Sequence, residues 1–225
     1  TSSFTEYFEG SVSTPPEDYT SALKSTKQGY EYDQYGNVTK FTDYGDPGDA
    51  DDVIATIQYD YQEASYIMDR PASIAVTGKD GTVYRLREGD YDNRGNLCRL
   101  TMRDKDGTLA ETVIGYNENG TILTLTDPPN ALGQKYNVRY GYDGETGTHI
   151  TMSTDSYGYT SYARYDLKYG KPLTTTDING QSTHYGYDEF GRLKMVMGPY
   201  DIGGTPVIQV SYDTASFPAK CVTKH

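Results

Sequence analysis

Residues 183–193 read Thr-His-Tyr-Gly-Tyr-Asp-Glu-Phe-Gly-Arg-Leu, and this stretch predicts a β-hairpin. Tyr185 and Tyr187 are two positions apart, so on an extended backbone both rings project from the same face. Asp188 favours a turn, because its carboxylate can accept hydrogen bonds from backbone N–H groups further along the chain. Gly191 fits the end of that turn, since a three-residue hairpin loop needs one residue at positive φ. The alternating residues that follow predict the return strand.

The same pattern recurs along most of the chain. The tyrosine before the turn occurs in eight copies, at intervals of 22 to 32 residues. The aligned pairs are Tyr32-Asp33, Tyr59-Asp60, Tyr91-Asp92, Tyr116-Asn117, Tyr142-Asp143, Tyr165-Asp166, Tyr187-Asp188 and Tyr212-Asp213. Glycines expected to close these turns include Gly36, Gly95, Gly120, Gly170 and Gly191. We call the eight tyrosines the turn tyrosines and the turns that follow them the YD turns.

A second family of turns lies about half a period later. Its members are Lys79-Asp80-Gly81, Asp104–Gly107, Asp155–Gly158 and Asp177–Gly180, with a proline-containing version at Asp127-Pro128-Pro129-Asn130. Two turns per period predict two strands per period, and hence about sixteen short strands. The predicted fold is all-β: an antiparallel meander of repeated hairpins in an elongated, twisted or spiralling sheet. Helical periodicity has one weak candidate, from Asp60 to Asp69.

The repeat also suggests how the chain is divided. Residues 1–28 lie outside the periodic region and predict an N-terminal arm, irregular or with one strand. Residues 29–225 predict a hairpin array of about eight units. Because the chain begins at Thr1 with neither methionine nor a signal-like segment, we expect an excised or processed piece.

Composition indicates which side chains shape the sheet. The 225 residues include 24 tyrosines but no tryptophan and only 5 phenylalanines, so tyrosine is the main large apolar residue. Each tyrosine ring brings a hydroxyl that needs water or a protein partner, which suits partly wetted sheets better than a thick aliphatic core.

The net charge of −12 argues against two classes of partner. Nucleic acid and anionic membrane surfaces both require clustered Lys and Arg, so neither is expected. Membrane insertion is not expected either, because no apolar run approaches the roughly 18 residues of a spanning helix.

The candidate chemical groups favour structural roles over reactive ones. The loop from Asp43 to Asp52 contains five aspartates, yet it lacks the ligand spacing of a known calcium loop, so a solvated acidic loop is the preferred interpretation. The turn aspartates are spaced as turn formers rather than as paired catalytic carboxylates. His149, His184 and His225 are isolated in sequence, and Cys98 and Cys221 are expected to be free, partly buried thiols. We therefore predict no catalytic residue, metal site or cofactor.

The motif Tyr-x-Tyr-Asp-x-x-Gly-Arg-Leu, followed by Asp-x-x-Gly turns, resembles the YD-repeat or Rhs-repeat family. The run from Tyr165 to Tyr200 matches best, and the eight copies cover most of the chain. Within the family the chain is most similar to bacterial toxin-complex B and virulence-plasmid B proteins, and the loop Asp43–Asp52 resembles an insertion that they also carry. The resemblance implies a β-shell that encloses a toxin polypeptide in a secreted or cell-surface protein. The self-cleaving aspartate segment of such shells has no counterpart, since Asp127-Pro128 is followed by Pro129-Asn130.

Three functional hypotheses follow. The first is a non-enzymatic structural module, a section of shell wall that encloses or presents a toxin or effector. Its partners would be the rest of its parent polypeptide and the enclosed segment. The second is a cell-surface adhesion or carbohydrate-binding module, with exposed tyrosines contacting surface glycans. The third is a hydrolase built on carboxylate pairs, and it is the least supported. Because exposed sheet edges invite pairing between copies, edge-to-edge dimers are expected.

Overall fold

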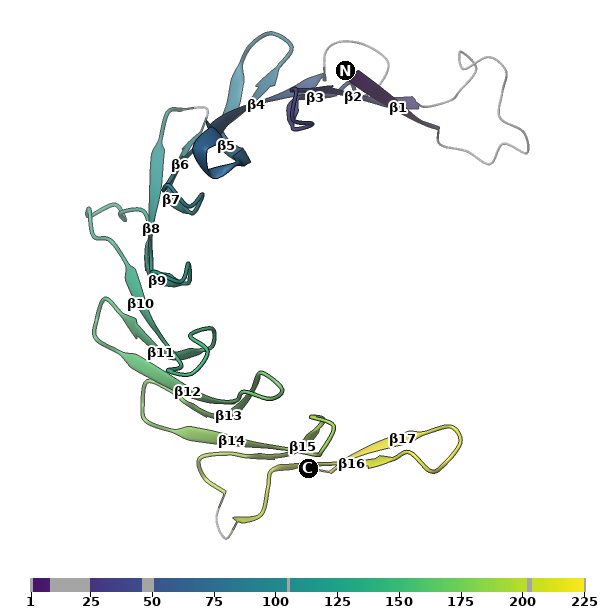
Figure 1. Cartoon of the computed structure of the whole chain (residues 1–225), viewed down its shortest axis with the longest axis vertical. Helices are drawn as coiled ribbons and strands as arrows, with labels where there is room; N and C mark the ends of the chain where they lie inside the picture. Colours follow the sequence, from purple (N-terminus) through teal and green to yellow (C-terminus); the bar gives the residue numbers. More distant parts are fainter. Residues whose placement is uncertain (1, 9–24, 46–50, 105, 202–203, 225) are drawn as a thin grey trace. The chain divides into compact units, whose positions relative to one another are not determined.

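The computed structural model describes residues 2–8, 25–45, 51–104, 106–201 and 204–224 (Figure 1). These residues form seventeen β-strands and one three-residue 3-10 helix. The chain divides into two units, residues 1–114 with 127–134 and residues 115–126 with 135–225. Among the described residues, no helix has the length and apolar character needed to cross a membrane.

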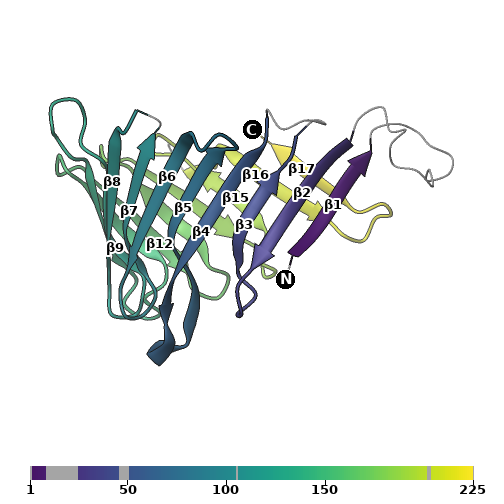
Figure 2. The same ribbon diagram turned by 90° about the horizontal axis from the view of Figure 1, so that it is seen from above.

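The strands of the first unit follow one another along the chain. They are β1 (Ser2–Phe8), β2 (Ser25–Tyr32), β3 (Val38–Asp43), β4 (Val53–Gln62), β5 (Ile67–Gly78), β6 (Val83–Tyr91), β7 (Leu97–Asp104) and β8 (Leu109–Tyr116), whose last two residues belong to the second unit. Each strand pairs antiparallel with the next. Figure 2 shows β4 to β8 side by side, with turns at both ends of the strands.

The second unit repeats this arrangement. Its strands are β9 (Ile122–Thr126), β10 (Asn137–Tyr142), β11 (Ile150–Asp155), β12 (Thr160–Asp166), β13 (Lys171–Thr176), β14 (Ser182–Tyr187), β15 (Leu193–Met197), β16 (Ile208–Asp213) and β17 (Lys220–Lys224). All pairings between successive strands are antiparallel. The predicted all-β antiparallel meander is confirmed.

The weak helical candidate from Asp60 to Asp69 is mostly strand. Strand β4 continues to Gln62, a 3-10 turn η2 (Glu63–Ser65) reverses the chain, and β5 begins at Ile67. Tyr66 ends this turn with φ 58°, in the left-handed region that favours glycine. The expected N-terminal arm lies partly outside the described residues, because positions 9–24 are not described, whereas β1 and the first residues of β2 fall within its predicted bounds.

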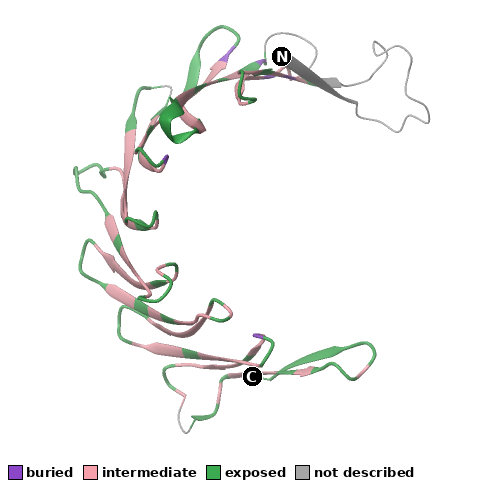
Figure 3. Cartoon of the chain, viewed as in Figure 1, coloured by how far each residue is buried: buried purple, intermediate pink, exposed green. Residues whose placement is uncertain are grey.

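The sheets form single layers without a buried apolar core. None of the described hydrophobic residues is buried, and most strand residues are half-buried (Figure 3). The buried polar residues are Thr42 and Asp52, at 8% and 6% exposure. Tertiary order in such a layer must come largely from strand ladders, turns and contacts between neighbouring hairpins.

Candidate functional site: the tyrosine-aspartate turns

The YD turn at Asp188 shows how the repeated residues build a hairpin loop. Its Oδ1 accepts the backbone N–H groups of Phe190 and Arg192 at 3.0 and 2.8 Å, and its Oδ2 accepts Arg192 Nε at 2.7 Å. Gly191 has φ 75°, and its N–H donates to the Asp188 carbonyl at 2.9 Å. The carboxylate therefore accepts hydrogen bonds from backbone N–H groups that have no strand partner in the tight turn.

The same geometry recurs in other copies and in both families of turns. Oδ1 of Asp33, Asp92, Asp104, Asp155 and Asp177 accepts N–H groups from the residues two and four positions later. The predicted closing glycines all have positive φ, with values of 90° at Gly36, 76° at Gly95, 85° at Gly120, 62° at Gly170 and 75° at Gly191.

In the remaining YD turns the Asp or Asn side chain bonds to different positions of the loop. Asp143 holds a longer loop, accepting the N–H groups of Thr146, Thr148 and His149 at 2.6, 3.1 and 3.0 Å. Asp166 accepts the N–H of Lys168 at 2.8 Å. The last copy is short: Asp213 Oδ1 accepts the N–H groups two and three residues later, both at 3.1 Å. In the Tyr116 copy, the amide of Asn117 donates to the Thr121 hydroxyl at 3.0 Å.

Two expected turns form differently. Asp60 starts no turn: it lies within β4, opposite Arg70, and its Oδ2 accepts the Gln62 amide at 3.0 Å. No glycine follows Asp60 at the turn-closing position, so nothing local favours a reversal there. The turn expected over Asp127–Asn130 is built instead on Asn130, whose Oδ1 accepts the N–H groups of the residues two and four positions later at 2.9 and 3.0 Å. Gly133, at φ 77°, closes it.

The turn tyrosines join one hairpin to the next, which the sequence did not predict. In the five copies given below, the hydroxyl of a turn tyrosine donates to a backbone carbonyl 15 to 21 residues earlier, near the start of the preceding copy's return strand. These bonds join Tyr59 to Val38 at 2.9 Å, Tyr91 to Pro71 at 3.0 Å, Tyr142 to Ile122 at 2.7 Å, Tyr187 to Pro172 at 2.7 Å and Tyr212 to Leu193 at 3.0 Å. We call them hydroxyl staples.

The strand register explains why such carbonyls need a partner. The ladder shifts register at Tyr32, Tyr59, Tyr91, Tyr142, Tyr165 and Tyr187. A register shift leaves backbone groups outside the regular ladder. Val38, Pro71, Pro172 and Leu193 each lie opposite a turn tyrosine at one of these shifts, and each accepts the hydroxyl of the following turn tyrosine.

Side chains in and beside the loops add a second set of links between neighbouring copies. Each donates to a backbone carbonyl of the next copy: Asn37 to Met68 at 2.7 Å, Gln62 to Asp92 at 3.0 Å, Arg70 to Gly95 at 2.8 Å, Asn119 to Gly147 at 3.1 Å, Tyr169 to Glu189 and Lys171 to Gly191. The Arg192 guanidinium also lies over the Tyr212 ring, 4.2 Å from its centroid. The donors differ from copy to copy, so no single motif reveals them.

The electrostatics of the turns oppose acid–base catalysis. Although desolvation works the other way, hydrogen bonds from Tyr61 and Asn37 lower the pKa of Asp33 to about 2. The bond to Asp33 in turn raises the pKa of Tyr61 to about 12. Hydrogen bonds from the backbone of His149 and Thr146 lower the pKa of Asp143. Carboxylates whose oxygens are already occupied by backbone donors are poor proton acceptors near neutral pH.

The histidines and the loop Asp43–Asp52 are the remaining candidates for a metal-binding or reactive site. Within the described part of the chain, no three His, Cys, Asp or Glu side chains are grouped so as to hold a metal ion. Residues 46–50 of the acidic loop Asp43–Asp52 lie outside that part, as does His225. His149 Nδ1 lies 3.6 Å from Asp143 Oδ2, and His184 Nδ1 lies 3.2 Å from the Thr174 hydroxyl.

Both cysteines are free, but only one is partly buried as expected. Cys98 lies half-buried in β7, whereas Cys221 is exposed in β17. The sheet that contains Cys221 is a single layer, so a strand residue there need not be covered.

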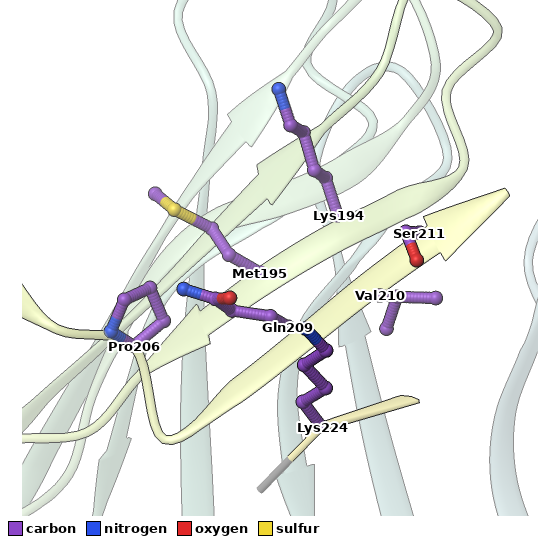
Figure 4. Close-up of a pocket in the computed structure, with 7 residues that line it drawn as sticks. All are labelled: Lys194, Met195, Pro206, Gln209, Val210, Ser211 and Lys224. Atoms are coloured by element: carbon purple, nitrogen blue, oxygen red, sulfur yellow. The ribbon is translucent and has the colours of Figure 1, made fainter. Parts of the chain in front are cut away.

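A surface pocket of about 320 Å³ lies on β15 to β17 (Figure 4). Its lining residues are Lys194, Met195, Pro206, Gln209, Val210, Ser211 and Lys224. It contains two lysines and no carboxylate, so it lacks the carboxylate pair of a glycosidase.

The repeat geometry agrees with a comparison against known families. Residues 165–197, from the last two residues of β12 with their YD turn to the end of β15, match the family model described as RHS Repeat. Residues 165–197 therefore resemble an RHS repeat. The predicted resemblance to the Rhs-repeat family is confirmed over these residues, which lie within the best-matching run of the sequence, Tyr165 to Tyr200.

Other comparisons give more distant similarity. None of the curated proteins matches the chain. The crystal structure of TcdB2-TccC3-TEV is 14% identical, with a TM-score of 0.42 over 90% of this chain and 13% of that chain. A Tc holotoxin pore from Photorhabdus luminescens is 15% identical, with a TM-score of 0.40 over 88% and 12%. A porin-like protein from Bacteroides uniformis is 13% identical, with a TM-score of 0.35 over 89% and 87%. The chain thus spans about an eighth of the length of the first two.

Proposed function

We propose that the chain is a non-enzymatic section of the wall of an Rhs-type shell, which encloses or presents a toxin or effector polypeptide of a secreted bacterial protein. The observation that carries this proposal is the series of hydroxyl staples. The hydroxyl of a turn tyrosine is used to hold one hairpin against the next, as between Tyr187 and Pro172 at 2.7 Å. The repeated polar groups therefore serve shape rather than reaction.

Two further observations support a wall. The hairpins form single layers with no buried hydrophobic residue among those described, so both faces of each sheet are accessible to another polypeptide. The turn aspartates are occupied by backbone donors, which suits a role in reversing the chain. A wall of this kind would lie at the cell surface or outside the cell, together with the rest of its parent polypeptide.

The test uses the full-length parent protein. Electron cryo-microscopy should show a closed or spiral β-wall around a cavity, and the segment inside should resist a protease that cuts the isolated segment. A parent that forms an extended rod without a cavity would overturn the proposal. So would equal protease sensitivity of the segment within the parent and on its own.

A second candidate function is supported by one cluster of exposed tyrosines. Tyr136, Tyr157 and Tyr159 are 41%, 76% and 55% exposed, and the Tyr157 ring lies 6.4 Å from each of the other two. Exposed aromatic rings of this kind can stack on sugars. A glycan-array screen of the chain and of its Tyr157→Ala variant tests the adhesion or carbohydrate-binding function. Absence of binding at millimolar sugar would remove it.

We also propose that residues 29–225 act as one array and that isolated chains associate through sheet edges, because unpaired backbone groups on an edge can pair with another copy. Sedimentation over a range of concentrations should show dimers. A monomer at the highest concentration would refute edge pairing and leave the wall proposal to its own test.

A further inference from the structure

The two units differ in net charge. Unit 1 has 22 acidic and 11 basic residues, a net charge of −11, whereas unit 2 has 10 acidic and 9 basic residues, a net charge of −1. The acidity of the chain is therefore concentrated in one unit.

Unit 2 also separates its charges by position. From β9 to β17, every acidic residue within a strand is the last residue of that strand: Asp155, Asp166 and Asp213. The other acidic residues lie in the connections between strands. Arg139, Arg164 and Lys194, in contrast, lie inside strands. The strand interiors of unit 2 thus carry cations and no acids.

The strand register places two of these cations, Arg139 and Arg164, on one face, together with Lys224 at the end of β17. Arg139 lies opposite Thr154, which lies opposite Thr160, and Arg164 is four residues further along the same strand. The even spacing keeps Arg139 and Arg164 on the same side of the sheet.

The same ladder extends this face to β17. Arg164 lies opposite Thr174, Thr174 opposite His184, and His184 opposite Met197. Two residues back along β15, Met195 lies opposite Gln209, which lies opposite Lys224. We call the surface defined by Arg139, Arg164 and Lys224 the cation face. It is the side away from Tyr140 and Tyr185, since these tyrosines neighbour Arg139 and His184 in sequence.

On the corresponding face of unit 1, the side away from Tyr30, basic side chains form ion pairs with acidic side chains. Ion pairs across its strands join Lys40 to Glu31 and Arg103 to Glu88, both at 3.3 Å. Arg99 lies 3.8 Å from Asp90 and 3.7 Å from Glu111.

No such neutralisation occurs on the cation face. Among the described residues, no carboxylate lies within ion-pair distance of Arg139, Arg164 or Lys224, and all three are exposed. The cross-strand partners of Arg139 and Arg164 are the threonines Thr154 and Thr174, and the Thr154 hydroxyl pairs with the Thr160 hydroxyl at 2.9 Å.

We propose that the cation face binds an acidic polypeptide segment. Charge complementarity carries the inference: exposed cations without acid partners attract carboxylates, and hydroxyls between them can bond to a peptide backbone. Arg139 and Arg164 are separated by two strand spacings and four residues, about 16 Å, which an extended peptide covers in about five residues. A polypeptide fits better than nucleic acid, because the −12 charge of the whole chain repels a dense polyphosphate. The inference rests on charge placement and does not require the proposed shell.

The test measures binding of a fluorescent peptide to the whole chain by anisotropy. The probe carries glutamates about five residues apart in a Gly-Ser background, and its matched control carries glutamines instead. The glutamate peptide should bind, the glutamine peptide should not, and binding should weaken as salt is raised from about 20 to about 200 mM, because screening acts strongly on exposed charges.

Paired variants locate the site. The double variant R139Q/R164Q should weaken binding roughly tenfold, which corresponds to a modest contribution from each exposed cation. R139K/R164K keeps the charge and should bind nearly as well as the parent. The control R99Q/R103Q, on the ion-paired face of unit 1, should bind the peptide unchanged. Circular dichroism verifies that each variant is folded.

Several results would overturn the proposal. These are equal binding of the glutamine peptide, equal binding by R139Q/R164Q, or the same loss in R99Q/R103Q. Tighter binding of a single-stranded oligonucleotide or of anionic vesicles than of the glutamate peptide would assign the face to a different partner. The peptide-binding results do not depend on whether the parent protein forms a shell, so failure of the shell proposal and failure of this one can be told apart.

Discussion

Replacing Tyr187 by phenylalanine tests whether the hydroxyl staples hold successive hairpins together. The ring stays in place and only the O–H group that donates to Pro172 at 2.7 Å is removed. A protein hydrogen bond contributes about 0.5–1.5 kcal/mol, and this change also leaves a half-buried carbonyl without that donor. We therefore expect a loss of about 1 kcal/mol in the local free energy of opening.

The position of the staple decides where the loss should appear. The ladder between β13 and β14 joins residues 174–176 to 182–184. The Tyr187 bond lies beyond this ladder, so its removal should loosen β13 and β14 more than distant strands. Native-state hydrogen exchange resolves this, because a change of 1 kcal/mol speeds exchange about fivefold in the affected segment.

The matched control is Tyr157→Phe. Tyr157 is 76% exposed, and its hydroxyl makes no hydrogen bond among those described, so this change should alter exchange little. Tyr59→Phe, Tyr91→Phe and Tyr212→Phe should behave like Tyr187→Phe, each in its own pair of hairpins. If Tyr187→Phe matches Tyr157→Phe, or if its effect spreads evenly over the chain, the staples do not join the hairpins and the reasoning is refuted.

Three other predictions follow from the turns. Gly191→Ala should destabilise the chain more than Gly36→Ala in urea unfolding. Both glycines have positive φ, a conformation that costs an alanine about 1 kcal/mol. A Cβ at Gly191 would also lie 2.7 Å from the Tyr169 ring, whereas Gly36 faces open space. Equal losses would show that the ring moves aside freely. Asp188→Ala should lower the free energy of unfolding by about 1–2 kcal/mol in the same assay, because three hydrogen bonds are lost. Asp60→Ala should lower it much less, since Asp60 starts no turn. The reverse order would contradict the turn assignment. Because the pKa of Asp33 falls from 3.8 to about 2 on folding, its contribution to stability is complete above pH 4 and is lost as the pH falls toward 2. Unfolding of the parent and of Asp33→Asn between these pH values measures this, and parallel curves would argue against it.

Turn-forming residues that act over a few adjacent positions account for most hairpins. Asp188 and Gly191 predicted a turn because the carboxylate and the positive φ act within five residues, and the structure contains that turn. The same reasoning went wrong at Asp60, where no closing glycine is present, and at Asp127, where Asn130 and Gly133 provide the turn instead. Local sequence is therefore informative where the whole Asp-x-x-Gly pattern is present.

The sequence alone determined the all-β class, the hairpin period and the resemblance of residues 165–197 to an RHS repeat, because these depend on patterns within a few adjacent residues. The tertiary structure decided what the turn tyrosines do and where the charges lie. A bond such as that from Tyr187 to Pro172 depends on a register shift in a different hairpin, and the cation face depends on which residues the ladder places opposite one another. Both are consequences of strand register, which forms only when successive hairpins pair side by side.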